Sequence, residues 1–162
     1  QVLEALLKAA HRAVQQERLE MADLNRPVAV VSRHPPAEPV VIEVIGGDSP
    51  EHLVLVELEW RRADPADNTA KLFRHLSEGT IEHPRVSVFQ VFTGKYDLVS
   101  GGVESRRKNA EFVGQVAADS VDELSYRPVE FPMTPPKRGG ERPEEWVEVT
   151  DGVAERIAAL LG

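Results

Sequence analysis

The chain has 162 residues and contains no cysteine, which excludes disulfides, thiolate metal sites and cysteine nucleophiles. It also has no apolar run near the roughly 20 residues that a membrane-spanning helix needs. Positive charge is scarce, since 19 Lys and Arg face 27 Asp and Glu and the formal net charge is -8. That balance argues against charge-driven binding of nucleic acid over the whole surface, but it is compatible with a local basic patch. The absence of cysteine fits a cytoplasmic protein.

The composition that is present is typical of a globular protein. With 41% hydrophobic and 28% charged residues, a chain of this length can bury one sizeable core. We expect a folded core over residues 1–125, a Pro-rich arm or loop over 126–149, and a C-terminal helix over 150–162 that packs on the same domain. The arm is predicted because five prolines and a Gly-Gly pair lie between Tyr126 and Trp146.

Hydrophobic periodicity predicts the order helix, three strands, helix, strand, helix, arm and helix. The expected elements before the arm are helices over 2–24, 67–78 and from Ser105, and strands over 27–33, 40–45, 52–60 and 85–92. The helix over 67–78 can cross over and bring strand 85–92 back parallel to strand 52–60. The predicted class is therefore α/β, with a small mixed sheet and helices on both sides.

Several individual positions follow from these patterns. Asp67 is expected to cap the helix over 67–78. Gln90 lies inside a strand that is predicted to be buried on both faces, so its amide needs hydrogen-bond partners. The expected inward residues are Ala70, Phe73 and Leu76 in the first of these helices and Ala110, Val113, Val116 and Ala117 in the second.

The strongest indication of chemistry is the strand over 52–60, which is apolar and ends in two carboxylates. Because side chains alternate across a strand, Glu57 and Glu59 share one face. Leu53 and Leu55 have the same parity, so this face begins apolar and turns acidic at its end, like the mouth of a pocket. An ionised carboxylate in such a run needs a cation or a hydrogen-bond partner. The alternative is a solvent-exposed face, on which the two glutamates serve only solubility.

Carboxylates on one sheet face form an all-oxygen site suited to Mg²⁺ or Mn²⁺. Glu43, on the preceding predicted strand, joins the pair only if the register of the two strands places it on the same face, and the sequence leaves that register open. Glu17 lies on the apolar stripe of the first predicted helix. Its carboxylate either points into the site or lies at the stripe edge and reaches solvent.

The order of elements, together with Glu43 and the run Glu57-Leu58-Glu59, resembles the restriction-endonuclease-like fold of the PD-(D/E)XK nuclease superfamily. That family has an αβββαβ core with an acid on the second strand and an acid-X-Lys signature on the third. The resemblance covers about residues 2–119. No Pro-Asp precedes the first acid, and Glu59 stands in the place of the lysine. The acid-X-acid form resembles the BamHI- and BglII-type branch.

This resemblance implies a Mg²⁺- or Mn²⁺-dependent endonuclease that hydrolyses DNA phosphodiesters and acts as a homodimer. Glu43, Glu57 and Glu17 would be metal ligands, while Glu59, with Glu57, would serve the catalytic step by orienting or deprotonating the attacking water. Lys71, one helix away, is a candidate for the missing lysine. The alternative is a catalytically inactive interaction domain with the same fold, which the loss of the lysine and the acidic charge favour.

The best basic patch is Arg106-Arg107-Lys108, at the start of a predicted helix. Backbone N–H groups at a helix N-terminus also attract phosphate, so these residues, together with Lys71, are the candidate nucleic-acid contacts. A solvated helix face is the alternative. The five histidines are scattered and lack the spacing of metal ligands.

Overall fold

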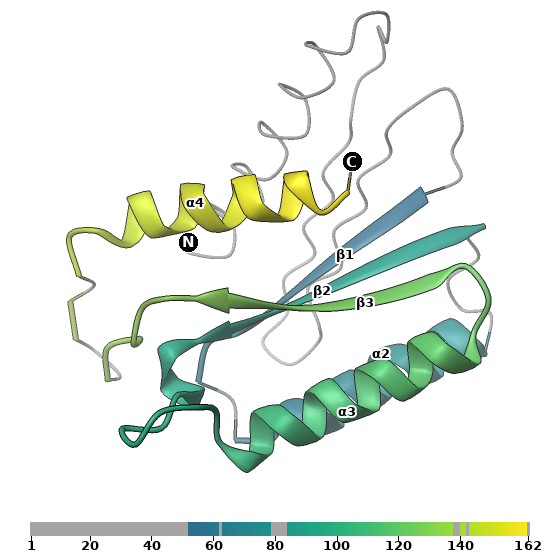
Figure 1. Ribbon diagram of the computed structural model, residues 1–162, viewed down its shortest axis with the longest axis horizontal. Coiled ribbons are helices and arrows are strands. Elements are labelled where there is room, and N and C mark those ends of the chain that lie inside the picture. Colours follow the sequence, from purple (N-terminus) through teal and green to yellow (C-terminus); the bar gives the residue numbers. More distant parts are fainter. Residues whose placement is uncertain (1–51, 62, 79–83, 138–139, 142, 162) are drawn as a thin grey trace, which may run out of the picture.

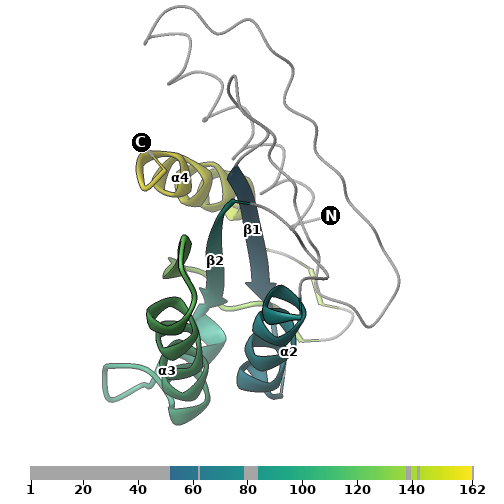
Figure 2. The same cartoon turned by 90° about the vertical axis from the view of Figure 1, so that its right-hand side faces the viewer.

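The computed structural model describes residues 52–61, 63–78, 84–137, 140–141 and 143–161. Within them, three strands form one parallel sheet in the order β1 (His52–Glu59), β2 (Arg85–Thr93) and β3 (Leu124–Phe131). Helices α2 (Pro65–Ser77) and α3 (Ser105–Ser120) cover one face of this sheet, and α4 (Trp146–Ala159) covers the other (Figures 1 and 2). The α/β class with helices on both sides of the sheet is confirmed, but the described strands are all parallel and do not form the predicted mixed sheet. The helix and strands expected before residue 52 lie outside the described residues.

Each strand reaches its neighbour through a helix. His52 pairs with Arg85 at the start of β1 and β2, and Val86 pairs with Leu124 at the start of β3, both in parallel. The predicted parallel return of strand 85–92 is therefore confirmed. β2 is the middle strand and is buried at every position except Arg85, as expected of a parallel strand covered on both faces.

Among the described residues, alternating side chains form one large apolar core on each face of the sheet, and Phe92, Tyr96 and Ala110 form a smaller third cluster. Apolar side chains that turn away from water contribute about 1.5–3 kcal/mol each when fully buried. The core beneath α4 contains Val54, Val56, Phe89, Val91, Val129, Phe131, Met133, Val153, Ala154 and Ile157. The core beneath α2 and α3 contains Leu53, Leu55, Leu72, Phe73, Val86, Val88 and Tyr126.

β3 corrects the predicted arm over 126–149. Residues 124–131, which include Pro128, form a strand of the sheet, and the described residues between Phe131 and Trp146 contain no helix or strand. Pro128 is tolerated because β3 lies at the edge of the described sheet, where a missing N–H can fall on the unpaired side. α4 begins at Trp146, before the predicted helix over 150–162, and packs on the same sheet.

The first turn of α2 also differs from the prediction. Asp64, not Asp67, is the N-cap, and its Oδ1 accepts a hydrogen bond of 3.1 Å from the Asp67 N–H. Pro65 occupies the first helical position, which needs no N–H donor. Phe73 is buried as predicted, whereas Ala70 is exposed because the buried face runs through Thr69.

α3 begins at Ser105 as predicted, and two of its predicted inward residues, Ala110 and Ala117, do face the core. Arg107, Ala110 and Gly114 turn inward, while Val116 is exposed at 48%. The prediction included Val116 wrongly and missed Arg107 and Gly114, because neither an arginine nor a glycine marks a buried face in an apolar pattern. No described helix combines the length and apolar character that crossing a membrane requires.

Gly114 makes room for the ring of Tyr126 in the α2/α3-side core. A Cβ added at Gly114 would lie under 3.0 Å from three ring carbons of Tyr126. We therefore expect Gly114→Ala to lower the free energy of unfolding by about 1–3 kcal/mol through overpacking, despite the better helix propensity of alanine. Chemical denaturation of the purified protein measures this change.

Gly152 of α4 is the matched control, because a Cβ added there meets nothing within 4 Å. Gly152→Ala should raise the free energy of unfolding by about 0.5–1 kcal/mol, which is the ordinary gain of alanine over glycine inside a helix. Equal effects at Gly114 and Gly152 would contradict the close packing of α3 on Tyr126.

Candidate functional site

The two carboxylates of β1 are buried side by side. Glu57 is 4% exposed and Glu59 is 0% exposed, and both share the parity of Leu53 and Leu55, which pack beneath α2 and α3. The prediction that the two glutamates share one face is confirmed, and the alternative of a solvent-exposed face is wrong. They lie toward the carboxyl end of a parallel strand, the edge where open α/β sheets bind ligands.

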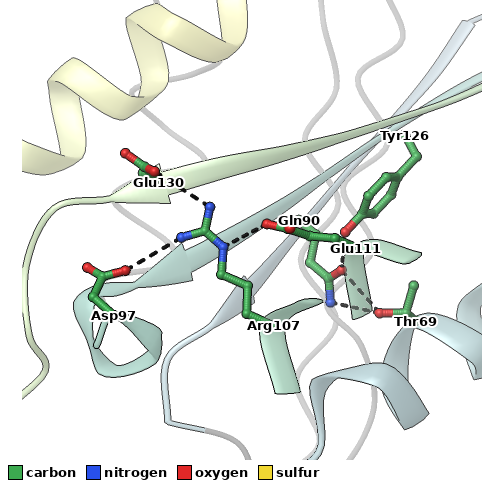
Figure 3. Close-up of polar contacts among 7 residues, drawn as sticks. All are labelled: Thr69, Gln90, Asp97, Arg107, Glu111, Tyr126 and Glu130. Atoms are coloured by element: carbon green, nitrogen blue, oxygen red, sulfur yellow. Dashed lines mark hydrogen bonds and ion pairs between the residues drawn. The ribbon is translucent and has the colours of Figure 1, made fainter. Parts of the chain in front are cut away.

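Gln90 of β2 links this acidic pair to its neighbours. The prediction that its buried amide has hydrogen-bond partners is confirmed. The Nε2 of Gln90 donates to Glu59 Oε1 at 2.9 Å and to Thr69 Oγ1 at 2.9 Å. The hydroxyl of Tyr126 donates to Gln90 Oε1 at 2.7 Å (Figure 3). β1, α2 and β3 are thus joined through one amide in the middle strand.

The orientation of this amide follows from the donors around it. Burial raises the pKa of Tyr126 above its ordinary value of 10.0, and the nearby carboxylates of Glu111, Glu57 and Glu59 raise it further, while Arg107 acts in the opposite direction. The phenol therefore keeps its proton and can donate it to Gln90 Oε1. The NH₂ group then faces the acceptor Glu59.

Arg107 organises a second cluster at the carboxyl edge of the sheet. Its guanidinium is 2.7 Å from Glu111 and 3.6 Å from both Asp97 and Glu130 (Figure 3). It also lies over the ring of Phe92, at 5.1 Å from the centroid. These acids come from the same helix, from the loop after β2 and from β3. One cation therefore fixes the positions of three segments.

This burial corrects the predicted basic patch. Arg107 is 6% exposed and its guanidinium is engaged by acids, so it does not belong to an exposed phosphate-binding face. Arg106 and Lys108 are exposed, and Arg106 pairs with Glu104 at 2.8 Å. Arg106 and Lys108 stay candidates for nucleic-acid contact, whereas Arg107 forms ion pairs within the fold.

Lys71 does not stand beside the acidic pair. Its side chain is 56% exposed and forms an ion pair with Asp67, one turn earlier on α2. The inward residues of this part of α2 are Thr69, Leu72 and Phe73. The ammonium of Lys71 is thus held on the solvent side, and the structure does not support it as the substitute for the missing lysine.

A complete metal site would draw on residues beyond those described. Glu43 and Glu17, the other predicted ligands, lie outside the described residues. Among the residues that are described, no three His, Asp or Glu side chains are grouped so as to hold a metal ion. Glu57 and Glu59 carry oxygen donors of the kind that Mg²⁺ and Mn²⁺ prefer, so the chemistry of these two side chains is compatible with the predicted metal.

The predicted site omitted Thr69, Tyr126, Asp97, Glu111 and Glu130. Of these, only Glu111 had a readable signal, because it lies four residues after Arg107 on a predicted helix. The partners of Gln90 come from three segments, 31, 21 and 36 residues away. Sequence spacing alone carries no information on such contacts.

The chain was compared with protein-family models, with curated proteins and with solved structures, and none of the three comparisons found a match. The function must therefore be argued from the geometry of the acidic pair and its surroundings.

The raised pKa of Tyr126 predicts how stability depends on pH. Below the ordinary pKa of 10.0 both states hold the proton, and above it the unfolded chain loses the proton while the folded protein keeps it. The free energy of unfolding should therefore fall as pH rises above about 10, by at most about 1.4 kcal/mol per pH unit from this group.

Tyr126→Phe removes the titrating phenol and should flatten this decline, since the other groups still titrate in both proteins. Urea unfolding between about pH 8 and 11 measures the two slopes, because this range spans the ordinary pKa of tyrosine. Identical slopes in the two proteins would show that Tyr126 ionises normally when folded.

The two neighbouring arginines of α3 give a second test. Arg107→Met should lower the free energy of unfolding by about 2–3 kcal/mol, because three acids lose their common cation. Arg106→Met removes an exposed ion pair with Glu104 and should cost less than about 1 kcal/mol. Equal costs, measured by chemical denaturation, would rule out Arg107 as the organising cation.

Proposed function

We propose that this chain is a nuclease-like domain that hydrolyses phosphodiesters of DNA with a divalent cation, with Glu57 and Glu59 as its acidic pair. The observation that carries the proposal is that both carboxylates are buried on one face near the carboxyl end of β1. A helix and a parallel strand follow β1, which is the order that the resemblance to the PD-(D/E)XK superfamily implies after its third strand.

Electrostatics support a cation at this place. Two ionised carboxylates two residues apart on a strand would repel each other where water is excluded, and a bound cation would lower this cost. The acidic field reaches across the layer, because Glu111, Glu57 and Glu59 all raise the pKa of the Tyr126 phenol. A site with negative potential and oxygen donors is suited to Mg²⁺ or Mn²⁺.

The side chains would divide the work as follows. Glu57 would be a ligand of the cation, with Glu43 and Glu17 as the proposed further ligands. When bound, such a cation polarises a phosphoryl oxygen and lowers the pKa of a coordinated water. Glu59 would orient that water or accept its proton. Gln90 donates to Glu59 Oε1 and so holds this carboxylate in one orientation.

The second candidate is a catalytically inactive interaction domain with the same fold. Glu59 stands where the family has its lysine, and Lys71 is held on the solvent side of α2. Under this alternative the bond between Gln90 and Glu59 is structural, and the pair binds no cation. The two candidates differ in one measurable property, the binding of Mn²⁺ in solution.

We expect calorimetric titration to show Mn²⁺ binding at or below millimolar concentration, and plasmid DNA to be cleaved with Mn²⁺ present. Glu57→Gln and Glu59→Gln keep the side-chain shape but remove a charged oxygen donor, so each should reduce binding and cleavage by at least about tenfold, or about 1.4 kcal/mol. Glu123→Gln is the matched control, because Glu123 is 63% exposed and pairs with Arg85.

The outcomes separate the candidates. Absence of Mn²⁺ binding at millimolar concentration would support the interaction domain. Binding without cleavage would keep the site and reject the activity. Cleavage that survives Glu57→Ala would reject the assignment of Glu57 as a ligand of the cation, because alanine has no oxygen donor in its side chain.

A further inference from the structure

α3 carries apolar side chains on the face that turns away from the sheet. Phe112 is 69% exposed and Val116 is 48% exposed. They are four residues apart and therefore neighbours on one side of the helix. The residues that pack inward, Arg107, Ala110 and Gly114, occupy the opposite side. α3 therefore exposes two large apolar side chains on its outer face, the side that faces away from the sheet.

Opposite charges flank this outer face. Lys108 lies four residues before Phe112, and Asp119 lies three residues after Val116, so both fall on the same stripe. Both are exposed, and Gln115 holds the Asp119 carboxylate by a hydrogen bond of 2.9 Å along the helix. From its N-terminus to its C-terminus the stripe therefore runs positive, apolar, apolar, negative.

Such a stripe is complementary to itself in one orientation. When two copies of α3 lie antiparallel about a twofold axis, Lys108 of each copy faces Asp119 of the other. Phe112 of each copy then faces Val116 of the other. We propose that the outer face of α3 is a dimer interface and that its occupant is α3 of a second copy of this chain.

The size of the helix sets the expected strength. α3 has 16 residues, which corresponds to a length of about 24 Å. One helix pair of this length buries less than the roughly 1,200–2,000 Å² of a stable complex. The dimer should therefore be weak and concentration-dependent, with a Kd of about 10 μM to 1 mM. The inference uses none of the residues of the acidic pair, so it stands or falls independently of the proposed function.

Two valines of equal exposure provide the first test. Val116 on α3 is 48% exposed and Val147 on α4 is 49% exposed. Sedimentation velocity over a concentration series should give a Kd for Val116→Glu at least about tenfold weaker than that of the unchanged protein, while Val147→Glu leaves it unchanged. A protein that stays monomeric throughout the series, or a dimer unaffected by Val116→Glu, would overturn the proposal.

Charge reversal tests the antiparallel register itself. Lys108→Asp alone places acids opposite acids, and Asp119→Lys alone places cations opposite cations, so each variant should be monomeric. Mixed in equal amounts they should form a heterodimer, because each aspartate then faces a lysine. Circular dichroism checks that both variants are folded, as expected for exposed positions. Dimers of either single variant, or no complex in the mixture, would refute the register.

Discussion

The amide of Gln90 is the interaction on which the α2/α3 side of the sheet depends. It is 1% exposed in the middle strand and binds Glu59 of β1, Thr69 of α2 and Tyr126 of β3. A buried amide that loses a partner costs about 1–3 kcal/mol. Each of the three elements must therefore be in place for the amide to be satisfied, and one side chain couples their positions.

Arg107 does for the carboxyl edge of the sheet what Gln90 does for its interior. Its side chain is buried, and it forms ion pairs with acids from the loop after β2, from α3 and from β3. Glu111 connects the two clusters, because it pairs with Arg107 and raises the pKa of Tyr126. The edge beside Glu57 and Glu59 is thus fixed by charge on one side and by hydrogen bonds on the other.

Regular periodicity made β1, α2, β2 and α3 predictable, and strand parity placed Glu57 and Glu59 on one face. β3 was missed because Pro128 is typical of loops, although an edge strand tolerates it. On α3 the inward position of Ala110 was predicted correctly, whereas the buried Arg107 was missed because its partners come from three segments. Local sequence patterns predict the helices, the strands and the face on which each strand residue lies. Contacts between distant segments decide which charged side chains are buried.

The parallel arrangement has a consequence for how the protein folds. His52 pairs with Arg85 and Val86 pairs with Leu124, so both strand pairs are parallel and neither can form from a tight turn. Each pair is joined by a long connection that contains a helix. Closing such long loops slows folding. A slip of one residue in β2 would turn Gln90 toward the apolar α4-side core, without partners. The hydrogen bonds of Gln90 therefore raise the free energy of misaligned intermediates relative to the native state, and so favour the native strand register.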